Sequence, residues 1–203
     1  MERQEALAVF RKGISKFIEF DETEWAIVSQ HLDLKKLKKK GLFAQPGIVC
    51  SEIGFILTGS VRYFNVKDGE EITGYFSFEN ELTSSYSSFL TRQPCLNYVQ
   101  ALEDTQLVII AYKNLQAMLA HPLLAYKMER FGRHVAEYYL ICYEDRMTSF
   151  ITKSPEERYL DLLNTGRDII RRMPQHYIAH FLGITPVSLS RIRKRILEPV
   201  VKA

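Results

Sequence analysis

The stretch Gln175–Lys194, QHYIAHFLGITPVSLSRIRK, constrains the fold of this chain more than any other segment. Small or apolar residues recur in it where two short packed helices need them: Ile178, Ala179, Leu182, Ile184, Leu189 and Ile192. Helices that cross at roughly 90–120° need a small side chain at the crossing, and the tight turn between them favours a glycine such as Gly183. Thr185 can cap the second helix, and Pro186 can fill its first position. The sequence therefore predicts a helix-turn-helix.

At about 100° per residue, Leu189, Ile192 and Ile196 of the second helix point inward. The residues on its opposite, outward face are of types that suit DNA. The residues expected to contact bases in a major groove are Pro186, Val187, Ser190 and Arg191. Arginine can donate two hydrogen bonds to guanine, and an exposed valine can pack on a thymine methyl. The residues expected to contact phosphates are Arg171, Arg172, Thr185, Ser188, Arg193, Lys194 and Arg195. Double-stranded DNA is therefore the predicted partner.

The distribution of charge supports this partner. The whole chain has 27 Lys and Arg against 24 Asp and Glu. Ten of these basic residues and five of the acids lie in 151–203, which leaves 17 basic and 19 acidic residues in 1–150. A basic C-terminal module on a nearly neutral body is typical of a protein that binds an anionic polymer. A solvated basic face is the alternative.

Between Gly41 and Tyr112 the sequence predicts a small antiparallel β-barrel or roll. Six of the ten glycines fall in 41–74 and separate short β-rich runs such as GFILTGSVRYFNV. The segment KDGEE, 67–71, is typical of a hairpin tip. The first 40 or so residues are expected to be helical, and the basic run Lys35–Lys40 is interpreted as a solvated lead-in to the β-domain.

A helix of about 30 residues is expected after Pro122. Its apolar residues recur at spacings of three and four and form one stripe: Leu124, Met128, Phe131, Val135, Tyr138 and Cys142. So long a stripe invites pairing with a second copy of the chain, and we expect these residues in a homodimer interface. The alternative is that the helix lies across its own β-domain. Another helix is expected to begin at Ser154 and Pro155, as N-cap and first helical residue.

The segments GFILTGSVRYF, SPEERYLDLL and LGITPVSLSRIRK, with the long helix between them, resemble the CRP/FNR family of bacterial transcription regulators over nearly the whole chain. The resemblance implies an α+β fold: an N-terminal antiparallel β-roll of the cyclic-nucleotide-binding type with flanking helices, a long dimerisation helix and a C-terminal winged helix-turn-helix. The corresponding domains are 1–121, 122–152 and 153–203. The implied partners are a palindromic DNA operator, a second copy of the chain, RNA polymerase and a small-molecule effector.

The sequence departs from this family at the effector site. Cyclic-AMP-binding members hold the ribose with a Gly-Glu pair and the phosphate with an Arg-Ser or Arg-Thr pair. Here FENELTSS contains no Gly-Glu, and Cys95 and Leu96 stand where the Arg-Ser pair would be. Because a buried cyclic phosphate without a cation is unfavourable, cyclic AMP in its usual mode is not expected. The residues expected to line an effector pocket are Glu81, Ser84, Ser85, Ser88, Cys95 and Leu96.

Other chemistry is not expected. No cysteine precedes Cys50 and no histidine lies between Val49 and His121, so the sequence predicts neither an N-terminal iron–sulfur cluster nor a haem or metal site in the roll. The acids and serines form no catalytic pattern, so no enzyme and no cofactor are expected. No run approaches the roughly 18 apolar residues of a membrane span, and a cytoplasmic location follows by default. The alternative function is a small-molecule sensor whose helix-turn-helix serves protein contacts.

Overall fold

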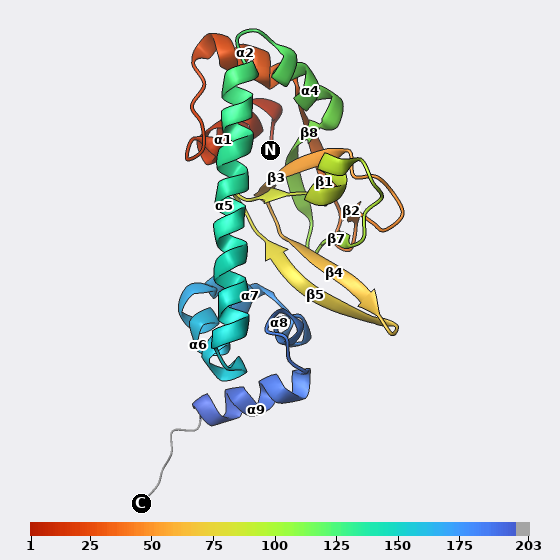
Figure 1. Cartoon of the computed structure of the whole chain (residues 1–203), viewed down its shortest axis with the longest axis vertical. Helices are drawn as coiled ribbons and strands as arrows, with labels where there is room; N and C mark the ends of the chain where they lie inside the picture. The colour runs from red at the N-terminus through yellow and green to blue at the C-terminus, as the bar shows by residue number, and fades with distance from the viewer. Residues whose placement is uncertain (198–203) are drawn as a thin grey trace, which may run out of the picture. The chain divides into compact units, whose positions relative to one another are not determined.

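The computed structural model describes residues 1–197 and shows a mixed fold of helices and antiparallel strands (Figure 1). The helices are α1 (Arg3–Ile14), α2 (Glu22–Gln30), α3 (Tyr86–Thr91), α4 (Tyr112–Ala120), α5 (Ala125–Thr152), α6 (Pro155–Thr165), α7 (Arg167–Arg172), α8 (Gln175–Phe181) and α9 (Pro186–Leu197). The strands are β1 (Leu32–Leu37), β2 (Leu42–Ala44), β3 (Glu52–Thr58), β4 (Val61–Lys67), β5 (Glu70–Ser77), β6 (Leu82–Thr83), β7 (Tyr98–Ala101) and β8 (Thr105–Ala111). The chain divides into two compact units, Met1–Tyr63 with Phe76–Leu140, and Phe64–Tyr75 with the chain from Ile141 onward.

The strands form two four-stranded sheets, in the orders β1-β8-β3-β6 and β2-β7-β4-β5. The pairs β1–β8, β3–β8, β3–β6 and β2–β7 are antiparallel. In the first sheet β3 and β8 lie in the middle, and consecutive residues along both strands are buried, including Phe55, Ile56, Leu107 and Val108. Successive side chains of a strand point to opposite faces, so both faces of this sheet are covered. The predicted antiparallel β-domain is confirmed.

The two-residue turn between β4 and β5 is the hairpin tip expected at KDGEE. Asp68 has a φ of 53° and Gly69 a φ of 83°. Positive φ at both central positions is the hallmark of a type I′ turn, whose twist matches the right-handed twist of the strands it joins. The local sequence therefore determines this hairpin.

The segment Leu32–Leu37 corrects the expectation that the chain is helical up to about residue 40. Helices α1 and α2 form as expected, but this segment is β1, which pairs with β8 from Leu32–Ile110 to Leu37–Thr105. Leu32 is buried and the following residues are mostly exposed, as in an edge strand. Pairing with the distant β8 thus outweighs the helical preference of the lysines, because strand formation depends strongly on context.

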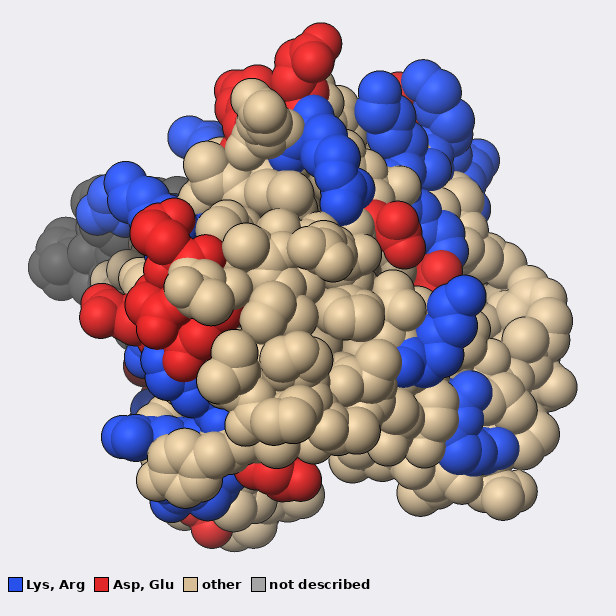
Figure 2. Space-filling view, turned by 90° about the horizontal axis from the view of Figure 1, so that it is seen from above, with Lys and Arg blue, Asp and Glu red and all other residues tan. Residues whose placement is uncertain are grey.

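The basic run Lys35–Lys40 lies among acidic partners. Lys35 forms an ion pair with Glu52 of β3, and Lys38 Nζ lies 2.7 Å from Asp104 Oδ2. The hydrogen bond with Asp104 raises the pKa of Lys38 above its ordinary value. The face of the molecule drawn in Figure 2 carries both acidic and basic side chains, with uncharged residues between them. The run is therefore partly ion-paired and not simply a solvated lead-in.

The first half of α5 packs on the core of the first unit. Leu124, Met128, Phe131 and Val135 are 0–7% exposed. They share one cluster with residues of α1, α2, β3 and β8, among them Ala6, Phe10, Ile14, Val28, Phe55, Leu57, Val108 and Ile110. These four side chains are buried against their own chain, so this half of the helix takes the alternative arrangement, packing across its own β-domain. They are therefore not proposed for the dimer interface.

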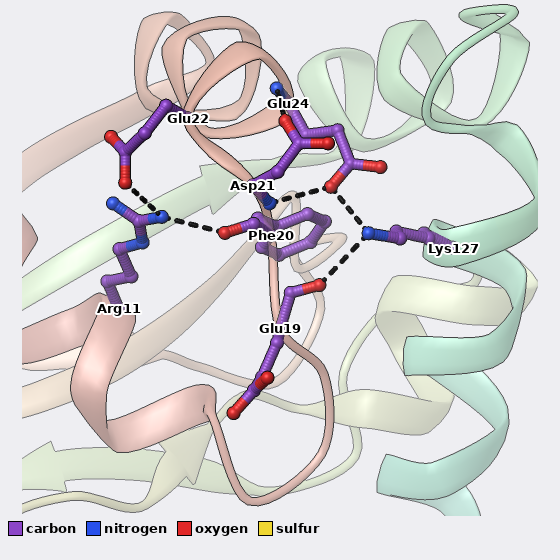
Figure 3. Close-up of polar contacts among 7 residues, drawn as sticks. All are labelled: Arg11, Glu19, Phe20, Asp21, Glu22, Glu24 and Lys127. Carbon is purple, nitrogen blue, oxygen red and sulfur yellow. Dashed lines mark hydrogen bonds and ion pairs between the residues drawn. The ribbon is translucent and has the colours of Figure 1, made fainter.

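A polar network also fixes α5 to α2 in the first unit (Figure 3). Lys127 Nζ donates to Glu24 Oε2 at 2.5 Å and to the carbonyl of Glu19 at 3.2 Å. The same Glu24 oxygen accepts the backbone N–H of Asp21 at 2.9 Å, and the Asp21 carboxylate accepts the N–H of Glu24 in return. This reciprocal capping box positions Glu24, so that the start of α5 is held by a carboxylate that is itself hydrogen-bonded.

The second half of α5 has a different surface. Tyr138 is exposed and Cys142 is half-buried, while Leu140, Met147 and Ile151 are 61%, 63% and 76% exposed. Spacings of seven and four residues place these last three side chains on one side of the helix. Among residues 1–197 neither α5 nor any other helix combines the length and the apolar character needed to cross a membrane.

Candidate nucleic-acid interface

Helices α8 and α9 pack together and are joined by the four residues Leu182–Thr185. Within this connection Gly183 has a φ of 70°, a left-handed conformation that side chains with a Cβ rarely adopt. A Cβ on Gly183 would also lie 2.7 Å from Cε1 of Phe150. The backbone conformation and the packing of Phe150 thus both require the glycine that the sequence places here.

The N-terminus of α9 is fixed by Thr185. Its Oγ1 accepts the backbone N–H of Ser188 at 3.1 Å and lies 2.9 Å from the Ser188 hydroxyl. Pro186, which has no N–H to satisfy, is the first residue of the helix. Such a cap typically stabilises a helix by about 1 kcal/mol. The predicted cap and the predicted first residue are both confirmed.

The inner face of α9 is anchored by burial. Leu189 and Ile192 are buried, as are Ile178 and Ala179 of α8. Fully burying a leucine or isoleucine side chain contributes roughly 1.5–3 kcal/mol, and the small Ala179 allows the two helices to approach. This contact fixes α9 in one orientation and leaves its opposite face outside the core.

The four residues predicted to contact bases gather on that opposite face. Pro186, Val187, Ser190 and Arg191 are all exposed, and the exposed fraction of Val187 is 61%. Within residues 1–197 neither Ser190 nor Arg191 makes a side-chain hydrogen bond or ion pair. A partner can therefore contact this face without first breaking an intramolecular interaction of these side chains.

The residues predicted to contact phosphates lie on α7, on α9 and at the cap of α9. Arg171 and Arg172 lie 3.6 and 4.0 Å from Asp168, and Arg195 Nη2 lies 2.6 Å from Glu156 Oε2. The others are Thr185 and Lys194, which are exposed, and Ser188 and Arg193, which are half-buried. Exposed ion pairs contribute only about 0–1 kcal/mol, so a phosphate can replace these carboxylates at little cost.

Part of the predicted effector pocket gathers around Cys50, which the sequence analysis did not single out. Ser88 Oγ accepts the N–H of Cys50 at 3.0 Å, and Ser84 Oγ lies 3.5 Å from the Cys50 thiol. Cys95 and Cys50 line the same cavity of about 360 Å³, together with Lys35. These buried polar groups largely satisfy one another.

The other predicted pocket residues lie elsewhere. Ser85 Oγ donates to Asn97 Oδ1 at 3.0 Å, and Leu96 is 85% exposed. The Glu81 carboxylate accepts the N–H of Phe78 at 3.0 Å, and burial raises its pKa above the ordinary value. Of the six residues only Cys95 lines the cavity described above, and the turns around β6 and α3 give the others different hydrogen-bond neighbours.

Two arginines that the sequence analysis missed hold the end of α8. Arg146 of α5 donates through Nη2 to the carbonyl of Phe181 at 2.9 Å. Arg158 of α6 donates through Nη2 to the carbonyl of Leu182 at 3.0 Å. The last carbonyls of a helix lack partners within the helix, and cationic donors suit them. Both arginines thereby fix the turn that precedes α9, a role that no local sequence pattern reveals.

No family model matches this chain, and no curated protein matches it. Solved structures match over most of its length, and among them are a cyclic-nucleotide-binding domain and regulators of the CRP/FNR type. The chain thus has the cyclic-nucleotide-binding fold.

Three of these structures illustrate the similarity. CLP of Xanthomonas campestris, described as a c-di-GMP-responsive global regulator, is 14% identical with a TM-score of 0.67, and the match covers 87% of this chain and 92% of CLP. A protein of Eubacterium rectale assigned to the crp/fnr family of transcriptional regulators is 19% identical with a TM-score of 0.62, covering 91% and 87%. A cyclic nucleotide-binding domain from Methylobacillus flagellatus is 18% identical with a TM-score of 0.59, covering 71% and 81%. Such identities establish a shared fold and no more.

Proposed function

We propose that this chain is a sequence-specific DNA-binding transcription regulator of the CRP/FNR type, acting as a homodimer on a palindromic operator. In this proposal α8 and α9 form the helix-turn-helix. The observation that carries it is the exposed group of Val187, Ser190 and Arg191 on α9, which stands opposite a buried contact with α8. The regulators that share the fold support the same function.

The two sets of residues on α9 have different roles in the proposal. With the N-terminal half of α9 in a major groove, Arg191 donates two hydrogen bonds to a guanine and Val187 packs on a thymine methyl. A good bidentate pair contributes roughly 1–3 kcal/mol of discrimination between bases. Arg193, Lys194 and Arg195 contact phosphates, so they contribute affinity that falls with salt and does not depend on sequence.

The homodimer uses the second half of α5 instead of the stripe predicted from the sequence. Leu140, Met147 and Ile151 expose apolar surface at heptad-like spacing, and a second copy of the helix can cover it. A two-fold axis along such a helix pair presents two identical recognition helices. The operator is then an inverted repeat with half-sites about 34 Å apart, one turn of DNA.

In this proposal residues 1–121 sense the effector, residues 122–152 form the dimer and residues 153–203 bind DNA. Cyclic AMP in the usual mode of the family is not the proposed effector. The side chains of Cys95 and Leu96 carry no positive charge, so neither supplies a cation for a cyclic phosphate. RNA polymerase is the expected further partner of a regulator of this type.

Selection of the bound sequences from a random DNA library tests this proposal. We expect the full-length protein to enrich an inverted repeat whose half-sites lie one helical turn apart. Binding should persist at physiological salt, at which non-specific complexes are weak. Enrichment of no common sequence, with binding that depends only on salt, would contradict the specific-regulator function.

A further inference from the structure

The second unit contains a cavity of about 550 Å³, formed by the end of α5, by α6 and by the end of α8. Its lining combines three cationic and three aromatic side chains, Arg146, Lys153, Arg158, Tyr75, Phe150 and Phe181. Two acids also line it, and one of them, Asp161, forms an ion pair with Lys153 at 2.7 Å. The proposed DNA-contacting face of α9 contributes no residue to this cavity.

Arg146 and Arg158 bring positive charge to this cavity and are not ion-paired with the two acids, Asp145 and Asp161, that also line it. Both residues are half-buried, and within residues 1–197 no carboxylate lies within ion-pair distance of either guanidinium. Burial lowers the pKa of Arg146, and the positive charge of Arg158 lowers it further, although Tyr75 acts in the opposite direction. Two neighbouring cations in a partly buried place are unfavourable, and an anion beside them would relieve that repulsion.

Some hydrogen-bond donors of Arg146 are unused. Its Nη2 makes both of its hydrogen bonds, to the carbonyls of Gly74 at 2.8 Å and Phe181 at 2.9 Å. Its Nε and Nη1 make no hydrogen bond within residues 1–197. The guanidinium carbon lies 4.0 Å from the centroid of the Phe181 ring and 4.9 Å from that of Phe150. Contact with both rings limits the rotation of the guanidinium, so its unused donors are preorganised for an oxyanion.

We propose that this cavity binds a small organic anion. Its oxyanion group, a phosphate or a carboxylate, is held by Arg146 with Arg158 beside it, and a planar apolar part lies against Tyr75 and Phe181. Charge-assisted hydrogen bonds from arginine supply the polar recognition, and the aromatic walls supply the apolar contact.

In this proposal, occupation of the cavity affects the orientation of α9 through Arg146 and Arg158. The same two guanidinium groups hold the carbonyls of Phe181 and Leu182, which lead into the turn before α9. An anion that neutralises the repulsion between Arg146 and Arg158 strengthens this clamp, and thereby stabilises the orientation of α9. Increased affinity for the operator follows, a consequence that rests on the proposed function, whereas anion binding itself does not.

Calorimetric titration of the DNA-free full-length protein at low ionic strength tests the site. Phenyl phosphate is the main probe, because it joins an oxyanion to a planar ring. We expect it to bind with 1:1 stoichiometry and more tightly than inorganic phosphate, which lacks the ring, or phenol, which lacks the oxyanion. Benzoate in place of phenyl phosphate distinguishes a carboxylate site from a phosphate site. Absence of saturable binding by both aromatic anions would overturn the proposal, and so would phenol binding equally well.

Two variants locate the binding. Arg146→Lys keeps the charge but loses the planar group, and Asn164→Asp keeps the size of a cavity-lining residue while adding a negative charge. Each is expected to weaken phenyl phosphate binding by about tenfold or more. Gln93→Glu adds the same charge in the first unit, which contributes no residue to the cavity, and should bind like the wild type. Asn164→Asp preserves packing, so it remains informative if Arg146→Lys fails to fold, and wild-type affinity in Asn164→Asp would refute the site.

The effect on DNA is measured separately, by titrating the selected operator with and without saturating phenyl phosphate. Tighter operator binding, lost in Asn164→Asp, supports the coupling to α9. Anion binding that leaves operator affinity unchanged would refute the coupling but not the site. A protein that binds the anion but selects no operator would refute the proposed function and leave the anion site standing.

Discussion

Helix α9 and the first half of α5 both carry a regular apolar stripe, and the two stripes have opposite meanings for partners. In α9 the stripe of Leu189 and Ile192 is buried, and the opposite face, which is exposed, is the one proposed to contact DNA. In α5 the stripe of Met128 and Phe131 is predicted from the sequence to pair with a second copy, but the core of the same chain covers it. A regular stripe thus shows that a face is buried without showing what buries it. Partners are indicated by apolar residues that the core leaves exposed.

Truncating a residue of the α5 stripe tests the intramolecular role of that stripe. Phe131→Ala should lower the free energy of unfolding by about 3–5 kcal/mol, because it removes a buried aromatic side chain and leaves a cavity. Met147→Ala, on the exposed side of the same helix, should change the unfolding of the protomer by less than about 0.5 kcal/mol. Urea unfolding at low protein concentration measures both. Similar values for the two variants would contradict the assignment of the stripe to the core.

A charge on the exposed side of α5 tests where the dimer forms. Met147→Glu should weaken self-association by at least about tenfold, because a carboxylate would be buried between two apolar helices. Sedimentation velocity over a range of concentrations gives the dissociation constant. Tyr126→Glu is the matched control, since Tyr126 is also exposed on α5 but lies far from 140–151 along the helix. Equal effects of the two substitutions would place the dimer interface elsewhere.

Removing one threonine hydroxyl at the start of α9 and one within α5 compares the two helices again. Thr185→Ala removes the cap of α9 and should destabilise the second unit by about 1 kcal/mol. In α5, Thr152 Oγ1 donates to the carbonyl of Thr148 at 2.7 Å within the helix, so Thr152→Ala should cost less than about 0.5 kcal/mol. Thermal unfolding followed by circular dichroism measures both variants. A cost for Thr152→Ala as large as that of Thr185→Ala would mean that the cap has no special role.

The features predicted correctly from the sequence are those that depend on neighbouring residues. The turn at Asp68-Gly69, the cap at Ser154 and the cap at Thr185 all arise within a few residues of chain. At the Ser154 cap the backbone N–H of Ser154 donates to the Glu157 carboxylate and lowers its pKa. Local chemistry of this kind is visible in sequence because the interacting groups are adjacent along the chain.

The errors concern contacts between distant parts of the chain. Strand β1 exists because β8, more than 60 residues away, pairs with it. The stripe of α5 is covered by α1 and β3, and Arg146 finds its carbonyl partner in α8. Periodicity gives the direction in which a side chain points but not the segment that meets it, so these partners could not be deduced from one sequence.

The central claim is that α9 recognises DNA sequence through its exposed N-terminal half, and the most direct test compares two substitutions on the selected operator and on its single-base variants. Arg191→Ala should cost roughly 1–3 kcal/mol on the operator and should abolish discrimination at one base pair of each half-site. Lys194→Ala should weaken binding to all sequences alike and reduce the salt dependence by about one phosphate contact. If Arg191→Ala instead weakens every sequence equally and leaves base discrimination intact, α9 does not recognise bases through Arg191, and the account is contradicted.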